Sequence, residues 1–407
     1  MQTNWRPFRL TLMILLALLL FSGGYVLGQS SLAPIYIFGP ALQIPSGSEQ
    51  FLRPFVESWQ LLHDEYFDQP LDDDSLLEGA LDGMLGTLGD PNTRYLSPEQ
   101  EEAARQAQQG NLEGIGAEVT EQDGAIVIVA PFEGSPAEAA GLKPGDILLK
   151  ADDEDLSDMS VAEAAALVRG PAGTQVRLVL ERSGEMIEVT VTRDVIRVPS
   201  VRGEILDDGL IYVRLSRFGN QTARELEETL DSLLAGQPIG MILDLRGNPG
   251  GSLNAVVEVA DQFLDQGLIL TQRYGDGRER VFEADEKGLA QDIGLVVLID
   301  EGSASASEVL AGAIRDSERG VLLGATSFGK GTVQDWQRLS NGGGLRLTTA
   351  RWLTPSGDWV HESGLDADIP IAVADSEGDS DVDVQLQQAI NYLLGKPLVE
   401  TSVDQGN

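Results

Sequence analysis

A run of small and hydroxyl-bearing residues at Asp300–Glu308 holds the first side chains in this sequence that could do chemistry. It reads Asp-Glu-Gly-Ser-Ala-Ser-Ala-Ser-Glu, follows an apolar segment typical of a buried strand, and opens a helical segment. A hydroxyl at a helix start lies among unpaired backbone N–H groups, at the positive end of the helix dipole. These groups can hold a developing oxyanion, so the pattern predicts a nucleophile for acyl transfer. The structural alternative is that Ser303 caps the helix and the small residues only pack.

A serine nucleophile needs a base, and the sequence offers few. Two histidines occur, His63 and His361, and there are five lysines against 23 arginines. Lys330 stands out because it lies between two glycines in Ser327–Gln334. Burial there would lower its pKa, and the neutral amine could then accept a proton, as arginine cannot. Two alternatives stay open: a surface lysine in a glycine turn, and a hydrolase in which His361 serves Ser305.

A third segment, Asp244–Gly251, reads Asp-Leu-Arg-Gly-Asn-Pro-Gly-Gly at the end of an apolar strand. A glycine-rich turn in this place exposes backbone N–H groups at the carboxyl end of a strand, where α/β sheets place their sites. The segment lacks the Gly-Lys-Ser/Thr continuation of a Walker loop, which excludes that kind of phosphate site. A purely structural turn is the alternative.

The composition excludes several function classes. The chain has 407 residues, 65 acidic against 28 basic side chains, and a net charge of -37. Nucleic acid and anionic lipid surfaces are therefore poor partners, because both require a basic face. The absence of cysteine removes thiolate nucleophiles, disulfides and cysteine-ligated metals, and two histidines cannot make a histidine-rich metal site.

The N-terminus has the pattern of an exported or anchored chain. Arg6 and Arg9 precede the uncharged apolar run Leu10–Leu27. This arrangement predicts an uncleaved single-pass anchor in the cell membrane with the remainder extracytoplasmic. The alternative is a cleaved signal and a periplasmic or secreted protein, although the small-x-small sequence Ser31-Leu32-Ala33 is followed directly by Pro34.

The elements behind these segments suggest two kinds of folded unit. Alternating strands and helices begin near Gly209, and their continuous apolar strands predict a sheet covered on both faces. The predicted strands are Leu210–Leu215, Met241–Leu245, Leu295–Ile299 and Val321–Leu323, with helices at Ala223–Leu234, Leu253–Leu264 and Ala304–Arg315. The predicted division is 1–30 anchor, 31–50 linker, 51–110 helical region, 111–198 separate unit with a β-hairpin, 199–374 core, and 375–407 acidic tail with a short helix.

Taken together, these motifs resemble those of the C-terminal processing peptidases, also called tail-specific proteases. The resemblance covers about residues 50 to 395. It rests on Asp244–Gly251, Gly302–Ala313 with Asp316, Ser327–Gln334, and a PDZ-like stretch at Gly134–Asp146. The family resemblance implies an α/β fold: a crotonase-like protease core, a mixed α+β PDZ domain inserted upstream at 111–198, and an N-terminal helical region.

The resemblance also implies a role for each matching residue. Ser305 would be the nucleophile of a serine endopeptidase, Lys330 its general base and Gln334 the group that orients the lysine. The backbone N–H groups of Gly251 and Ala306 would form the oxyanion hole. Glu308 and Asp316 would give acidic support. No metal or organic cofactor is implied.

The PDZ domain implies a peptide partner. Gly114, Ile115, Gly116 and Ala117 would receive a peptide's terminal carboxylate, with the following strand accepting the peptide as an added strand. Arg169 could sense the carboxylate, or it could interact only with its own helix dipole. The implied partners are unfolded or flexible C-terminal tails of exported proteins, and the sequence leaves a homo-oligomer open.

Two further questions stay open in the sequence. Lys330 and Gln334 would touch if their segment were helical, whereas in a strand they would share a face at a distance. A non-catalytic, membrane-anchored PDZ scaffold with a peptide-binding core is the rival function, although the presence of both Ser305 and Lys330 argues against it.

Overall fold

The computed structural model describes residues 47–398, apart from 109–110, 123, 133, 158, 286 and 372–382. The chain divides into two compact units between Leu76 and Leu77. The anchor predicted at Leu10–Leu27 lies outside the described residues, as do most of the predicted linker and much of the acidic tail. Among the helices that are described, none is long and apolar enough to cross a membrane.

The first unit contains α2 (Glu49–Glu65) and the beginning of α3 (Asp73–Gly86). His63 stacks on Trp59, with 5.4 Å between the ring centroids. Its two ring nitrogens are hydrogen-bonded to the Trp59 carbonyl at 2.9 Å and to the Asp73 carboxylate at 2.6 Å. These contacts raise the pKa of His63, the backbone hydrogen bond most. The described contacts of His63 are therefore all with residues of the first unit.

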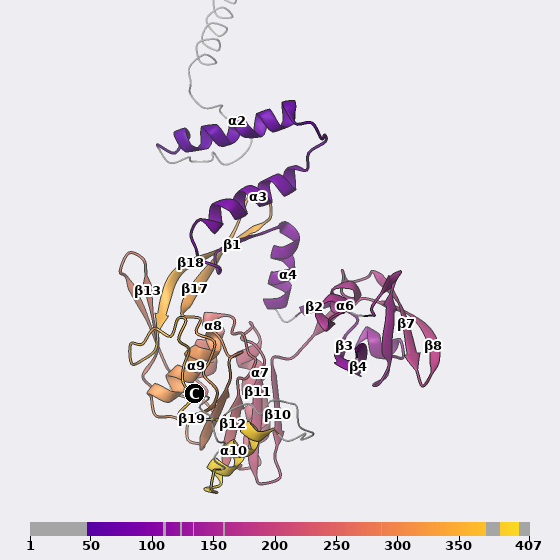
Figure 1. Ribbon diagram of the computed structural model, residues 1–407. Helices are drawn as coiled ribbons and strands as arrows, with labels where there is room; N and C mark the ends of the chain where they lie inside the picture. The colour runs from indigo at the N-terminus through magenta and orange to yellow at the C-terminus, as the bar shows by residue number, and fades with distance from the viewer. Residues whose placement is uncertain are drawn as a thin grey trace, which may run out of the picture. The chain divides into compact units, whose positions relative to one another are not determined.

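The second unit is built around a six-stranded sheet with helices on both faces (Figure 1). Its strands, in order across the sheet, are β10 (Val201–Ile205), β11 (Leu210–Leu215), β12 (Gly240–Asp244), β15 (Leu295–Ile299), β16 (Val321–Gly324) and β19 (Ile369–Pro370). All neighbouring strands are parallel except β10 and β11. The predicted alternation of strands and helices around a covered sheet is confirmed, and the four strands that were predicted have bounds within one residue of those expected.

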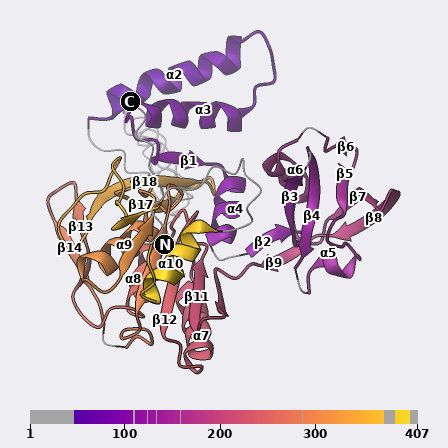
Figure 2. The same cartoon turned by 60° about the horizontal axis from the view of Figure 1, so that its bottom comes forward.

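The two faces of this sheet are covered by different helices. α7 (Thr222–Leu234), α8 (Leu253–Ala260) and α9 (Ala306–Asp316) share one apolar cluster with Met241 and Leu243. α10 (Val384–Leu393) packs on the other face, where Ile242 belongs to its cluster (Figure 2). Alternate residues of a strand point to opposite faces, so burial on both sides explains why β12 carries no polar side chain before its last residue, Asp244.

A second, five-stranded sheet lies in the same unit and was not predicted from the sequence. It contains β1 (Arg94–Leu96), β18 (Gly344–Leu353), β13 (Leu268–Tyr274) and β14 (Glu279–Glu283) in this order, with β17 (Thr332–Arg338) also paired to β18. The expectation that residues 51–110 are helical is wrong at β1. Three residues before α4 (Pro98–Gln108) become a strand because they pair with β18, about 250 residues later. Local periodicity cannot report such a distant pairing.

The predicted PDZ segment folds around its own apolar cluster, which includes Ile126, Leu148 and Leu178. Its sheet has the order β3, β4, β5, β7, β8, with β6 paired to β5. The elements are β3 (Ala117–Gln122), β4 (Ala125–Pro131), α5 (Pro136–Ala139), β5 (Ile147–Ala151), β6 (Glu154–Asp155), α6 (Val161–Val168), β7 (Gln175–Arg182) and β8 (Glu185–Thr192). The antiparallel pair β2 (Asn111–Gly114) and β9 (Asp194–Arg197) joins the two ends of the segment.

Candidate active site

Ser305 lies at the N-cap of α9, directly after the turn that follows β15. Its φ of 55° falls in the left-handed region, which is disfavoured for a residue with a Cβ and costs about 1–3 kcal/mol. The helix begins at Ala306, two residues later than predicted. Ser303 does not cap it, because its hydroxyl donates to the Leu245 carbonyl at 2.9 Å. The strained residue is therefore the serine at the helix start, which forms a capping box with Glu308.

The glycine turn after β12 packs directly against Ser305. A Cβ at Gly250 would lie 2.6 Å from the Ala304 carbonyl oxygen and 2.8 Å from the Ser305 Cβ, so only glycine fits. A Cβ at Gly251 would lie 2.1 Å from the Phe218 carbonyl oxygen. Within the described residues, the N–H groups of Gly251 and Ala306 donate to no protein acceptor. Two free backbone donors thus lie beside the serine.

Glu308 joins the serine segment to the lysine segment. Its carboxylate is fully buried and accepts four hydrogen bonds: from the Ser305 N–H at 2.7 Å, the Ser327 hydroxyl at 2.6 Å, the Gly329 N–H at 2.6 Å and the Lys330 N–H at 2.9 Å. Because the donors come from two segments about 25 residues apart, this one carboxylate sets their relative position. A buried carboxylate is tolerated where hydrogen bonds replace its water.

One cavity of about 340 Å³ collects most of the predicted catalytic residues. Ser305, Lys330, Gln334, Gly251 and Ala306 all line it. Glu308 is completely buried and is not among the residues that line the cavity. Asp316 lies at the far end of α9, and its carboxylate accepts hydrogen bonds from the N–H and hydroxyl of Ser356 instead.

Lys330 is partly buried in this cavity. Burial lowers the pKa of its amine to about 8, helped by the positive charges of Arg346 and Arg94 and opposed by Glu308 and Asp90. About a tenth of the amine is therefore neutral at pH 7, far more than at the ordinary lysine pKa, and the neutral form is the one that a general base requires. No direct hydrogen bond joins Lys330 to the Ser305 hydroxyl among the described contacts.

Gln334 lies in β17, so the helical alternative for Lys330–Gln334 is wrong. Its amide nitrogen donates to the hydroxyls of Thr332 at 2.9 Å and Thr348 at 3.3 Å. Its carbonyl oxygen accepts from Arg346 at 3.3 Å. The side chain makes no described hydrogen bond to Lys330, so its orienting role stays a prediction.

His361 does not line the cavity that contains Ser305. It borders a different pocket, of about 1060 Å³, which Lys330 also borders. Its Nδ1 accepts a hydrogen bond from the Gly331 N–H at 3.4 Å, and its ring stacks on Trp359 with 5.0 Å between centroids. The positions of these residues therefore do not support the alternative in which His361 is the base for Ser305.

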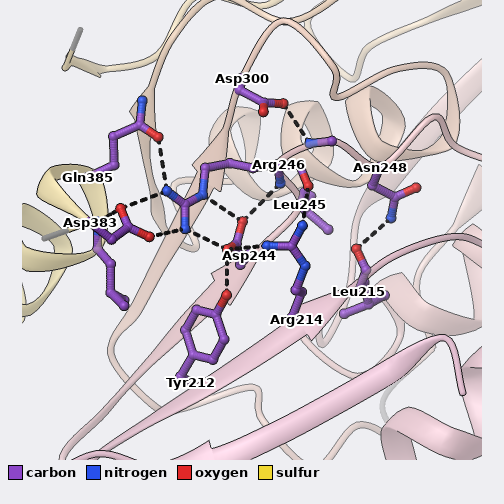
Figure 3. A network of polar contacts seen from close by, with 12 residues as sticks. Tyr212, Arg214, Leu215, Asp244, Leu245, Arg246, Asn248, Asp300, Asp383 and Gln385 are labelled. Atoms are coloured by element: carbon purple, nitrogen blue, oxygen red, sulfur yellow. Dashed lines mark hydrogen bonds and ion pairs between the residues drawn. The ribbon is translucent and has the colours of Figure 1, made fainter. Parts of the chain in front are cut away.

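A network of charges fixes the start of the glycine turn (Figure 3). The buried Asp244, the last residue of β12, accepts hydrogen bonds from Tyr212 at 2.6 Å and from the Arg246 guanidinium at 2.7 and 2.9 Å. Burial, with the charge and hydrogen bond of Asp244, raises the pKa of Tyr212 to about 12. Arg246 also donates to the Asp383 carboxylate at 2.7 and 2.9 Å. The guanidinium thereby connects the turn to the first residue before α10.

Replacing Asp383 with alanine should destabilise the protein by about 1–2 kcal/mol, because it removes an N-cap and a partly exposed ion pair together. Asp383 caps α10 by accepting from the Leu386 N–H at 3.0 Å. Urea unfolding measures the change. Gln387→Ala, on the exposed side of the same helix, is the matched control and should shift stability by less than about 0.5 kcal/mol. Equal effects of the two changes would contradict the anchoring role.

The residues predicted to bind peptide gather around a groove in the PDZ segment. Gly114, Ile115, Gly116, Ala117 and Arg169 all line a cavity of about 310 Å³ between β3 and α6. A Cβ at Gly114 would lie 3.6 Å from the Arg169 Cγ, which places the stem of the arginine against the loop. The groove is lined mainly by aliphatic side chains, as a site for an apolar peptide end requires.

Arg346 is a charged residue of this cavity that the sequence did not single out. It lies in β18 and lines the cavity with Ser305 and Lys330. The alternation of Leu345, Arg346 and Leu347 was a signal for a strand. Its place beside Lys330 depends on the pairing of β17 with β18, which only the tertiary structure reveals.

Family models match most of the described chain. The model for peptidase family S41 matches residues 209–371, that for a PDZ domain matches 127–182, and that for the activating protease CtpB N-terminal domain matches 43–100. These matches overlap the segments 199–374, 111–198 and 51–110 that the sequence analysis distinguished, without sharing their bounds.

Known proteins with similar sequences or structures are also C-terminal processing proteases or S41 proteases. The carboxy-terminal processing protease CtpA of Bacillus subtilis is 39% identical over 321 residues, which is 78% of this chain and 68% of that protein. A carboxyl-terminal-processing protease of Synechocystis is 37% identical over 83% of this chain and 82% of its own length. The solved photosystem II D1 C-terminal processing protease is 31% identical, with a TM-score of 0.50 over 80% of this chain and 93% of its own. A putative S41 protease from Bacteroides fragilis, at 17% identity, has a TM-score of 0.55 over 81% of this chain and 91% of its own, and shows the fold alone. The chain therefore belongs to the carboxy-terminal processing proteases, serine-type peptidases of family S41 that carry a PDZ domain.

Proposed function

We propose that this protease cleaves peptide bonds with Ser305 as nucleophile and Lys330 as general base. The observation that carries the proposal is the single cavity that both residues line, together with Gly251 and Ala306. Neutral Lys330 takes the proton of the Ser305 hydroxyl, and the oxygen attacks the scissile carbonyl. The free N–H groups of Gly251 and Ala306 bind the oxyanion that results.

The second half of the reaction uses the same groups. The Lys330 ammonium gives its proton to the leaving amine, which releases the C-terminal fragment and leaves an acyl-enzyme on Ser305. Lys330, neutral again, takes a proton from water as the water oxygen attacks the ester carbonyl. It then gives this proton to the Ser305 oxygen as the ester bond breaks, which releases the acyl fragment and restores both groups. Glu308 keeps the two reacting segments in register through its four hydrogen bonds.

The substrates we propose are flexible, apolar C-terminal tails of exported proteins. The groove lined by Ile115 and Arg169 supports this, because it combines an aliphatic floor with backbone N–H groups and one cation at its edge. The proposed location is outside the cytoplasm with an anchor at Leu10–Leu27. Extraction of membranes with carbonate tests the anchor, since an integral segment stays in the pellet.

The decisive experiment compares the protein with its Ser305→Ala variant on an unfolded reporter that ends in an apolar tail. Cleavage by the parent and its loss in the variant, with both proteins folded by circular dichroism, would establish the peptidase site. Ser307→Ala is a matched control, because the Ser307 hydroxyl donates to the Asn248 carbonyl and does not line the cavity. Cleavage that survives Ser305→Ala would reject the assignment.

Filling the PDZ groove should weaken tail recognition without stopping the chemistry. Ala165→Trp places a large side chain in the groove and should raise KM for the tailed reporter by about tenfold or more, because a blocked pocket loses its buried contacts. Ala166→Trp changes the exposed neighbour on the same helix, outside the groove, and should leave KM unchanged. Short peptides without a tail should be cleaved alike by both variants. Equal KM values for the tailed reporter would contradict the recognition role.

A further inference from the structure

Arg346 is a partly buried cation without a counter-charge. Among the described residues it forms no ion pair, and its guanidinium donates one hydrogen bond, to the Gln334 carbonyl oxygen at 3.3 Å. Its Nε is buried and has no partner. Buried guanidinium groups are normally paired with carboxylates, because leaving N–H donors without acceptors costs free energy.

The neighbours of Arg346 do not supply the missing negative charge, and one of them is itself a cation. Arg94 lies directly opposite it in the pairing of β1 with β18. Burial, and then the charge of Arg94, lowers the pKa of Arg346. The third group beside it is the ring of Trp336, whose centroid is 5.7 Å from the guanidinium carbon. An aromatic face attracts a cation but accepts none of its directed hydrogen bonds.

The cavity itself favours an anion. Among the described residues its lining includes two basic side chains, Lys330 and Arg346, and not one aspartate or glutamate. The whole chain has 65 acidic residues and a net charge of -37, so an acid-free cavity with two cations differs sharply from the rest of the molecule. When Lys330 is neutral, as catalysis requires, Arg346 is the charged side chain that remains in the lining.

We propose that Arg346 binds a carboxylate of the peptide substrate close to the scissile bond and thereby determines part of the cleavage-site preference. A carboxylate supplies the two parallel acceptors that a guanidinium binds in a bidentate manner. The carboxylate can belong to an acidic side chain or to the free end of a short tail. This inference rests on the proposed function, because it requires peptides to enter the cavity that contains Ser305.

The test is a panel of matched peptides cleaved by the protein. One arm exchanges glutamate for glutamine at each position around the scissile bond, and the other exchanges a terminal acid for an amide. The parent should prefer the acid at one position by about 10- to 100-fold in kcat/KM, the usual worth of a hydrogen-bonded charge. The arm in which the preference occurs identifies the source of the carboxylate.

Arg346→Gln should abolish the preference, and Arg346→Lys should keep a reduced one, since the charge remains without the bidentate geometry. Arg94→Gln is the matched control: it removes the opposite cation, which does not line the cavity. Both Arg346→Gln and Arg94→Gln should raise the pKa of Lys330 and shift the pH profile, because both cations lower that pKa. The preference should change with Arg346 alone.

Two results would overturn the proposal: a parent that cleaves acid and neutral peptides equally at every position, or a preference that survives in folded Arg346→Gln. Calorimetry gives a reading that needs no cleavage: the Ser305→Ala protein and the Ser305→Ala/Arg346→Gln double variant are compared in their affinity for the glutamate and glutamine peptides. If the parent cleaves no peptide, the proposed function fails, and this binding comparison still decides the role of Arg346.

Discussion

Lys330→Ala is expected to reduce kcat/KM by about 10⁴-fold, because the Ser305 hydroxyl loses its proton acceptor: Lys330 is the only group in the described lining of the cavity that can take up a proton. Lys330→Arg should not restore activity, since arginine does not deprotonate near neutral pH. Hydrolysis of a chromogenic peptide measures both variants. Lys287→Ala, at an exposed lysine, is the control and should retain the parent rate.

The pH profile gives an independent check of Lys330. Its pKa is lowered to about 8 by burial and by Arg346 and Arg94, with Glu308 and Asp90 acting in the opposite direction. The base is active when neutral, so kcat/KM should level off above about pH 8 and fall about tenfold for each pH unit below it. Full activity at pH 6, or activity that survives in folded Lys330→Ala, would reject Lys330 as the base and favour His361.

Glu308→Ala is expected to affect both activity and stability strongly. It leaves four donors, including the N–H groups of Ser305 and Lys330, without their acceptor in a fully buried place. The loss should be about 3–5 kcal/mol in unfolding free energy. The Ser305 backbone, held at φ 55°, should then relax toward an ordinary helix start, with kcat reduced by about 10²-fold or more.

Glu308→Gln separates the two effects. The amide keeps the size of the side chain but offers one oxygen, and its NH₂ group faces backbone N–H donors. A folded protein with kcat reduced more than KM is raised would show that Glu308 positions the dyad. Glu301→Gln, at an exposed acid two residues after β15, serves as the control. Unchanged kcat in folded Glu308→Gln would contradict the positioning role.

Much of the fold could be predicted from the sequence alone. Strands such as Leu295–Ile299 are apolar at every position, and only a sheet buried on both faces requires this, so β15 was predicted with its exact bounds. Ser305 and Lys330 could be singled out because a helix start rich in hydroxyls and a rare lysine between glycines are local features. The family resemblance then assigned their roles, and the family matches agree with it.

What only the tertiary structure decided is how segments distant in sequence meet. The left-handed backbone at Ser305, the four donors around Glu308 and the described hydrogen bonds of Gln334, none of which reaches Lys330, have no local signature. Arg346 reaches the cavity because β17 pairs with β18. Propensity and periodicity report the neighbours of a residue along the chain, whereas strand pairing and the burial of a charge depend on register and packing between segments. The residue types that can do the chemistry can therefore be recognised in the sequence, whereas the distances and contacts between them cannot be predicted from it.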